Sequence, residues 1–209
     1  MICLHALRYA LVKKDQQRWA LLSNLISPQY HHDLYCAYPT DGFVRCIRDR
    51  GPKKHYSFHL QNLILENKYS PTMYSVHKIW VELVQQLMSD AYNNALSRCL
   101  DISLQSTYIN ISFYRFDKGD WVAPHIDNED KIVTQIFYFN PIWSNIWGGC
   151  FKLLASHRME DEQFSVPPLV NFSVAIARSL EAWHCVNPVA EIAKTSRLSL
   201  QLEFIKKQG

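Results

Sequence analysis

The sequence lacks any long apolar run. None approaches the roughly 18 residues that a membrane-spanning helix requires. Its first ten residues, Met1 to Ala10, have neither the basic start nor the apolar stretch of a secretory signal peptide. We therefore expect no membrane-spanning segment and a cytoplasmic protein.

The chain also lacks paired cysteines and a large net charge. Its six cysteines are scattered without a Cys-x-x-Cys pair, and in a chain with no secretion signal they indicate reduced thiols. The formal net charge of +3 is too small to favour a nucleic-acid partner, because the basic clusters are short and carry no interleaved aromatic residues. Internal repeats and low-complexity segments are absent as well.

What is present is ordinary globular material. The 209 residues are 48% hydrophobic and 20% charged, enough for one domain with a substantial core. We expect a single domain over residues 1–209. Residues 1–100 would form a helical and loop-rich support, and residues 101–209 would form the catalytic core.

The first hundred residues carry two helix-like patterns. Residues 14–26 have apolar residues at helical spacing and predict an amphipathic helix that ends at Ser27-Pro28. Residues 75–96 form the longest helical pattern, with one apolar face. Between them, residues 29–70 have poor periodicity, so we expect short strands and loops there. One interpretation is that this segment forms a lid over a ligand site.

From about residue 101 the pattern changes to short strands. Four runs are rich in Val, Ile, Phe and Tyr and bounded by turn-forming residues, namely 108–116, 131–139, 170–177 and 197–205. Helices followed by strands fit a mainly β fold with flanking helices, in which a double-stranded β-helix (a jelly-roll or cupin-like barrel) is supported on one side.

Four polar residues stand out against these runs. His125 and Asp127 form a His-x-Asp tripeptide, His184 lies between two later strands, and Arg197 opens the last strand. Two imidazoles and one carboxylate on one face of a metal leave the opposite face open, as a non-haem Fe(II) oxygenase requires. A His-x-Asp tripeptide alone fits a surface turn equally well, and its place among the strands is what favours the metal site.

In this order and setting the chain resembles the 2-oxoglutarate/Fe(II)-dependent dioxygenase superfamily, especially its prolyl-4-hydroxylase-like branch. The resemblance covers roughly residues 106–206 and includes the segments Gly148–Leu154 and Trp183–Pro188. It implies Fe(II), 2-oxoglutarate and O₂, with iron bound by His125, Asp127 and His184.

The resemblance also assigns the co-substrate pocket. Arg197 would pair with the distal carboxylate of 2-oxoglutarate, since a guanidinium meets a carboxylate in a two-bond fork. Ser199, two residues along the same strand face, would donate its hydroxyl to that carboxylate. Many prolyl hydroxylases have Lys in place of Arg197, and Tyr where this chain has Phe116. Tyr114 would supply the missing hydroxyl.

The substrate is less constrained. Because the chain has no recognition domain and no strongly basic surface, we expect a small-molecule hydroxylase acting on an amino acid or on a carrier-bound or peptide intermediate. Asp127 disfavours halogenation, since related halogenases have Gly or Ala there. Five residues would shape the mouth of the barrel and contact substrate: Trp121, Tyr138, Trp143, Asn145 and Trp147. For the loop 143–147, ordinary packing under the barrel rim is the favoured alternative.

Several alternatives stay open. A hydroxylase of prolyl or other protein residues fits the resembling branch. The acidic continuation after Asp127 suggests an AlkB-like nucleic-acid demethylase, but residues 198–205 lack the second Arg usual in that group. A barrel that binds metal or ligand without turnover is a further alternative, and the intact triad with Arg197 and Ser199 argues against it. A cupin that does not use 2-oxoglutarate would be indifferent to Arg197→Ala.

Overall fold

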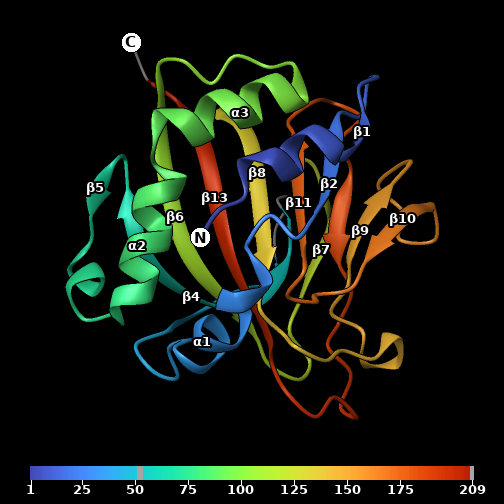
Figure 1. The fold of residues 1–209 in the computed structure, drawn as a ribbon. Helices are drawn as coiled ribbons and strands as arrows, with labels where there is room; N and C mark the ends of the chain where they lie inside the picture. The colour runs from blue at the N-terminus through green and yellow to red at the C-terminus, as the bar shows by residue number, and fades with distance from the viewer. Residues whose placement is uncertain (51–53, 208–209) are drawn as a thin grey trace.

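The fold is a curled antiparallel sheet with helices on one side (Figure 1). The computed structural model describes residues 1–50 and 54–207. The strands are β1 Leu11–Lys13, β2 Trp19–Ser23, β3 Val44–Arg48, β4 Tyr56–Leu65, β5 Lys68–Tyr69, β6 Thr107–Phe116, β7 Trp121–His125, β8 Lys131–Tyr138, β9 Phe151–Leu154, β10 Glu162–Val166, β11 Phe172–Ala177, β12 His184–Val186 and β13 Arg197–Lys206. The α-helices are α1 His31–Cys36, α2 Lys78–Leu87 and α3 Asp90–Leu100. The 3-10 helices are η1 Leu4–Tyr9, η2 Pro28–Tyr30, η3 Pro71–Tyr74 and η4 Asn145–Trp147.

The sheet follows the order β1-β2-β11-β8-β13-β6-β4-β7-β12-β9-β10, with β3 and β5 also paired to β4. Strand β4 is the joint: it pairs with β6 through residues 59–64 and with β7 at Tyr56 and Ser57. The sheet therefore folds over on itself and encloses the space between its two halves. The prediction of a mainly β, double-stranded β-helix fold with flanking helices is confirmed.

Helices α2 and α3 cover the outer face of β6, β13 and β8 (Figure 1). The indole of Trp80 on α2 is fully buried, and its ring lies edge-on to Phe113 and Phe139 at centroid distances of 4.7 and 4.8 Å. Its Nε1 donates a hydrogen bond of 2.7 Å to the carbonyl oxygen of Ala37. Burying side chains of this size stabilises each by roughly 1.5–3 kcal/mol. This layer fixes the strands that carry the site.

The long helix predicted over residues 75–96 is two helices. Helix α2 ends at Leu87, and Ser89 begins α3 by accepting a hydrogen bond of 3.3 Å from the Tyr92 amide on its hydroxyl oxygen. A serine at this place satisfies one of the free amides of a new helix, so the apolar pattern continues across a break in the backbone.

The helix predicted over residues 14–26 is wrong, because these residues hold β2, which pairs with β11. Ala20 and Leu22 pack into the core beneath the helices, whereas Trp19 and Leu21 pack into a second core on the other face. A strand covered on both faces is a continuous apolar run without alternation, which periodicity alone does not distinguish from a helix.

The four strands predicted in the second half of the chain are confirmed as β6, β8, β11 and β13. Residues 29–70 contain short strands, as predicted, together with the ten-residue strand β4. The predicted lid stays a prediction, and residues 51–53 of that stretch lie outside the described residues. The N-terminal half contributes β1–β5 to the same sheet as the C-terminal strands, and the division near residue 100 stays a prediction.

Within the described part of the chain, every helix is too short or too polar to cross a bilayer. The six cysteines are all free thiols.

Candidate iron centre

The two histidines of the predicted triad face each other across a strand pair. Strands β7 and β12 are antiparallel, and their register places His125 directly opposite His184. The two rings have centroids 4.2 Å apart, and both side chains are buried. Side chains opposite each other in such a pair lie on one face of the sheet, so strand pairing brings together residues 59 positions apart in the sequence.

Both imidazoles present the same nitrogen to the interior. Nδ1 of His125 lies 2.9 Å from the carbonyl oxygen of Ala123, and Nδ1 of His184 lies 2.8 Å from that of Ala182. A carbonyl oxygen only accepts, so each Nδ1 carries the proton and donates it. Each Nε2 is then left with a lone pair. This is the tautomer that a metal-binding histidine needs.

Asp127 completes the cluster from the segment just beyond β7. One carboxylate oxygen lies 3.9 Å from Nε2 of His125, and the three ligand atoms of His125, Asp127 and His184 all lie within 4.8 Å of one another. We call these three residues the central cluster. Lys131 Nζ donates to one oxygen of Asp127 at 3.2 Å, and Thr134 Oγ1 donates to the other at 2.8 Å.

The electrostatics favour the metal-binding form of each ligand. Burial lowers the pKa of both His125 and His184, so the imidazoles stay neutral. Burial raises the pKa of Asp127, but the nearby positive charge, that of Lys131 first, outweighs burial and holds this pKa well below its usual range. Two neutral imidazoles and one carboxylate are the protonation states that bind a divalent cation.

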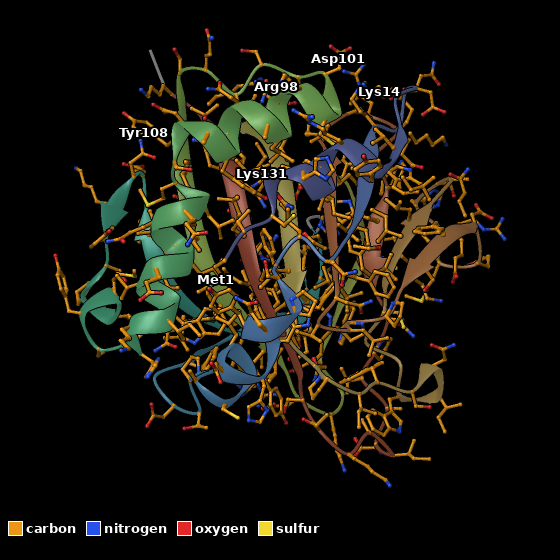
Figure 2. All side chains as sticks on the ribbon, in the orientation of Figure 1. Met1, Lys14, Arg98, Asp101, Tyr108 and Lys131 are labelled. Atoms are coloured by element: carbon orange, nitrogen blue, oxygen red, sulfur yellow. The ribbon has the colours of Figure 1, made fainter. Side chains whose placement is uncertain are left out.

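Lys131 is itself held in place. Its ammonium donates to Glu203 Oε1 on β13 at 2.6 Å as well as to Asp127, and the residue begins β8 behind the helical layer (Figure 2). Burial lowers the pKa of this lysine, but the two carboxylates outweigh burial and raise it. Lys131 therefore remains a cation that orients the Asp127 carboxylate.

Arg197 is a buried cation without a counter-ion. Its side chain is 1% exposed, and its guanidinium lies over the rings of Phe116 and Tyr138, 4.5 and 5.2 Å from their centroids. It donates to Ser199 Oγ at 3.0 Å, while its Nε has no hydrogen-bond partner. In residues 1–50 and 54–207 no carboxylate lies within ion-pair distance of it. Since a buried unpaired charge is costly, this position is suited to an anionic ligand.

The strand register places the other two predicted co-substrate residues, Ser199 and Tyr114, opposite each other on neighbouring strands. Ser199 on β13 lies opposite Tyr114 on β6, and its hydroxyl is 3.3 Å from the Tyr114 carbonyl oxygen. One cavity inside the barrel is lined by the central cluster together with Arg197, Ser199 and Tyr114. Burial raises the pKa of the Tyr114 hydroxyl, so it remains a proton donor.

The five residues predicted to contact substrate lie elsewhere. None of them lines this cavity or the groove beside it in the described structure. Tyr138 is fully buried against Arg197, and Trp143 is buried with its Nε1 donating to the Gly148 carbonyl oxygen at 2.8 Å. Asn145 and Trp147 are in η4, and Trp121 begins β7. Packing accounts for Trp143 and Trp147, whose rings are 5.4 Å apart, and a substrate role for the five stays a prediction.

Sequence reasoning missed residues that do line the cavity. Among them are Lys54, Phe58, Thr134 and Gln201. Thr134 could have been found from the sequence. It stands two residues before Ile136 on a predicted strand, so the two side chains lie on the same face, and both line the cavity. Lys54 could not have been found in this way, because its contact with His125 spans 71 residues.

The chain matches a protein family model over its C-terminal half. Residues 109–203 match the model of the 2OG-Fe(II) oxygenase superfamily. No curated protein matches the chain.

Solved structures share the fold at low sequence identity. A Pseudomonas putida prolyl-4-hydroxylase has a TM-score of 0.61 and 16% identity, with 91% of this chain and 93% of that chain covered. An oxidoreductase of the 2OG-Fe(II) oxygenase family from Burkholderia pseudomallei has a TM-score of 0.65 and 11% identity, covering 91% and 86%. A non-haem α-ketoglutarate-dependent epimerase from nogalamycin biosynthesis has a TM-score of 0.61 and 10% identity, covering 97% and 84%.

The double-stranded β-helix and the cavity with its two histidines and one aspartate are the arrangement typical of non-haem Fe(II) oxygenases. Residues 109–203 match the 2OG-Fe(II) oxygenase superfamily, and this match supports a 2-oxoglutarate-dependent dioxygenase. The family implies Fe(II), 2-oxoglutarate and O₂ as cofactor and co-substrates.

Proposed function

We propose that this protein hydroxylates, or otherwise oxidises, an unactivated C–H bond of a small molecule. Amino acids and carrier-bound or peptide biosynthetic intermediates are the substrates we expect. The observation that carries the proposal is the presence, in one cavity, of the central cluster and a buried Arg197 that has no counter-ion among the described residues. A metal and a dicarboxylate would satisfy both at once.

In this proposal His125, Asp127 and His184 hold the iron through two Nε2 atoms and one carboxylate oxygen. The Nδ1 hydrogen bonds fix the imidazole orientations, and Lys131 and Thr134 fix that of the carboxylate. Bound iron supplies the oxidising chemistry of the family. The three protein ligands leave the remaining coordination positions for 2-oxoglutarate and O₂.

Arg197 and Ser199 bind the distal carboxylate of 2-oxoglutarate, and the Tyr114 hydroxyl donates to it from the facing strand. The geometry supports these roles because Arg197 Nη1 and Ser199 Oγ are already 3.0 Å apart and can share one anion. The rings of Phe116 and Tyr138 exclude water from the guanidinium, which strengthens its attraction for a carboxylate.

A hydroxylase of prolyl or other residues in peptides is the second candidate. It is favoured by the similarity in fold to solved prolyl hydroxylases from Pseudomonas putida and Trichoplax adhaerens, the latter in complex with a peptide fragment. The small-molecule proposal is favoured by the similarity to the epimerase from nogalamycin biosynthesis. Succinate release stimulated by proline-containing peptides, and by no free amino acid, would favour the second candidate.

Anaerobic titration of the metal-free protein with Fe(II) and then 2-oxoglutarate tests the cofactor chemistry. We expect a weak visible charge-transfer band when 2-oxoglutarate binds the iron. Asp127→Ala should lose the band with the iron, whereas Arg197→Ala should bind iron and lose the band at moderate 2-oxoglutarate concentrations. Arg98→Ala is the matched control, because Arg98 is an exposed arginine on α3 on the helical side (Figure 2).

Iron binding without the band in the unaltered protein would contradict the proposal and leave a cupin-like or non-catalytic barrel. A band that is equally strong in Arg197→Ala would contradict the assignment of Arg197 alone.

A further inference from the structure

A groove opens beside the central cluster and continues the inner cavity outward. The cavity and the groove share Lys54, His125 and Asp127 as lining residues. The groove is also lined by Arg48 at the end of β3, Tyr56 on β4, Arg178 after β11 and Trp183 before β12. A molecule in this groove reaches the iron ligands from solvent without crossing the Arg197 pocket.

Lys54 brings a positive charge to the innermost part of the groove. Its Nζ lies 3.3 Å from Nε2 of His125, and no carboxylate of the described residues lies within 4.0 Å of it. The ammonium of Lys54 therefore lies beside the nitrogen atom to which the metal would bind. Once that nitrogen binds a divalent metal, two positive charges stand close together in a partly buried place, and an anion between or beside them would offset their repulsion.

Arg178 brings a second positive charge to the lining of the groove. Its side chain is 23% exposed, and its Nε is buried without a hydrogen-bond partner. The nearest carboxylate is Glu129, at 4.0 Å from Nη2 with a side chain that is 92% exposed. Such an exposed and distant pair contributes little, so the guanidinium is free to bind another anion.

The charges that line the groove do not cancel. Arg48, Lys54 and Arg178 are positive, while the two negative side chains are Asp127 and Glu129. Asp127 already accepts from Lys131 and serves the metal in the proposed function. The walls also offer two aromatic surfaces, Tyr56, which has Arg48 over its ring at 5.4 Å, and Trp183.

We infer that this groove binds a carboxylate of the substrate, with Lys54 and Arg178 as the pairing cations and Tyr56 and Trp183 as the apolar walls. The substrate is then an organic acid with an apolar or aromatic body, held so that a C–H bond near its carboxylate faces the iron. The inference deepens the proposed function and rests on it, because Asp127 and His125 must hold the metal.

The test uses benzoate as the probe and benzamide as its uncharged counterpart. Each is titrated calorimetrically into the anaerobic complex of the protein with Fe(II) and saturating 2-oxoglutarate. Benzoate should bind and benzamide should not. Lys54→Gln and Arg178→Gln should each weaken benzoate binding about tenfold, as expected for the loss of one charge-assisted hydrogen bond. Lys54→Arg should retain binding.

Lys68→Gln is the matched control, because Lys68 is an exposed lysine on β5 and lines neither the cavity nor the groove. Its benzoate affinity should equal that of the unaltered protein. The 2-oxoglutarate affinity, read from the charge-transfer band, should be unchanged in Lys54→Gln and Arg178→Gln. Thermal melting of each variant verifies that it is folded.

Several results would overturn the inference. Equal binding of benzoate and benzamide, no benzoate binding, or equal affinities in Lys54→Gln and Lys68→Gln would each exclude a carboxylate site here. Inorganic phosphate that binds more tightly than benzoate through the same two residues would make the substrate a phosphate ester. A parallel loss of 2-oxoglutarate affinity in Lys54→Gln would assign Lys54 to the co-substrate.

The two proposals fail in different ways. If the charge-transfer band never forms, the oxygenase chemistry fails, and the benzoate titration on the metal-free protein still reports on the groove. If the band forms and benzoate affinity is unchanged in Lys54→Gln and Arg178→Gln, only the groove assignment fails.

Discussion

Two clusters of histidine and aspartate lie in the same barrel, and they differ in the hydrogen bonds that their potential ligand atoms already make. The central cluster has two histidines and one aspartate. The second group, which we call the turn cluster, consists of His59, Asp117 and Asp120 near the turn between β6 and β7. Both bring three potential ligand atoms within 4.8 Å of one another. By composition and spacing alone, each is a candidate metal site.

The hydrogen bonds separate the two clusters. In the turn cluster all four carboxylate oxygens already have donors, and Arg115 contacts both oxygens of Asp117 at 3.1 and 3.2 Å. Ser57 and Ser196 donate to Asp120 and Asp117, and the Asp117 amide donates to Asp120 at 2.9 Å. A divalent cation there would have to displace the arginine. The turn cluster therefore ties a turn together, whereas the central cluster presents two unprotonated nitrogens.

The comparison teaches that imidazole tautomers and existing hydrogen bonds, not residue types, distinguish a candidate metal site from a structural polar cluster. The carbonyl oxygens of Ala123 and Ala182 are decisive, since they turn the two imidazoles so that each Nε2 points inward. Changes that act on one cluster and spare the other can test it.

The largest difference is expected in metal binding. Asp127→Ala and His184→Ala should each lower Fe(II) affinity about a hundredfold or more, because loss of even an outer partner of a metal ligand costs 10–100-fold. Asp117→Ala should leave Fe(II) affinity unchanged. Anaerobic calorimetry with Fe(II) measures both. An equal loss in Asp117→Ala would mean that the turn cluster also holds metal.

Stability should respond in the opposite sense. Asp120→Ala removes a buried carboxylate that accepts from Ser57 and the Asp117 amide and pairs with His59 at 3.2 Å. We expect a loss of about 3 kcal/mol in the free energy of unfolding, since the remaining partners are left buried. Urea unfolding of the metal-free protein measures it. Retention of full stability would contradict a structural role for this cluster.

A matched pair of hydroxyl deletions sharpens the comparison. Thr134→Val removes the hydroxyl that donates to Oδ2 of Asp127, and Ser57→Ala removes the hydroxyl that donates to Oδ1 of Asp120. Thr134→Val should weaken Fe(II) binding about tenfold, because the carboxylate loses its orientation. Ser57→Ala should leave iron affinity unchanged and destabilise the fold by about 1 kcal/mol. Iron titration and urea unfolding of both variants measure these effects. Weaker Fe(II) binding in Ser57→Ala, or unchanged Fe(II) binding in Thr134→Val, would contradict the prediction.

The smallest effect is a pH dependence of the metal-free protein. Folding lowers the pKa of His125 and His184 below their ordinary 6.5, so the unfolded chain binds more protons once the pH falls below that value. Stability should therefore decrease as pH falls from 6.5 toward 5.5, by about 1 kcal/mol per imidazole. His184→Asn should flatten this slope, while the exposed His157→Asn should not. Urea unfolding at both pH values measures the change in the free energy of unfolding. A free energy of unfolding that is higher at pH 5.5 than at pH 6.5 would contradict the prediction.

The sequence patterns were most informative where chemistry and strand structure coincide. Strands β6, β8, β11 and β13 are rich in Val, Ile, Phe and Tyr and bounded by turn-forming residues, so their existence could be predicted, whereas the cavity residues Thr134 and Gln201 on them were missed. Strand β2 was predicted as a helix, because both of its faces are covered and its apolar run carries no period of two. The break at Ser89 was hidden because the apolar face continues from α2 into α3.

The candidate site divides along the same line. Ligand chemistry at His125, Asp127, His184 and Arg197 could be proposed from residue types and order in the chain. The groove residues Lys54 and Arg178 could not, because they come from loops that precede β4 and follow β11. Aromatic residues were predicted at the barrel mouth, but large rings serve cores as readily as ligands, and the fold placed Trp143 in the core.

By itself, then, the sequence determined four strands of the C-terminal half and the three candidate metal ligands, because strand composition and residue chemistry are local properties. Tertiary structure alone decided three other features. Strand register placed His125 against His184, backbone carbonyl oxygens selected their tautomers, and packing left Arg197 buried with no anion. These depend on contacts between residues far apart in the chain, which no local pattern encodes.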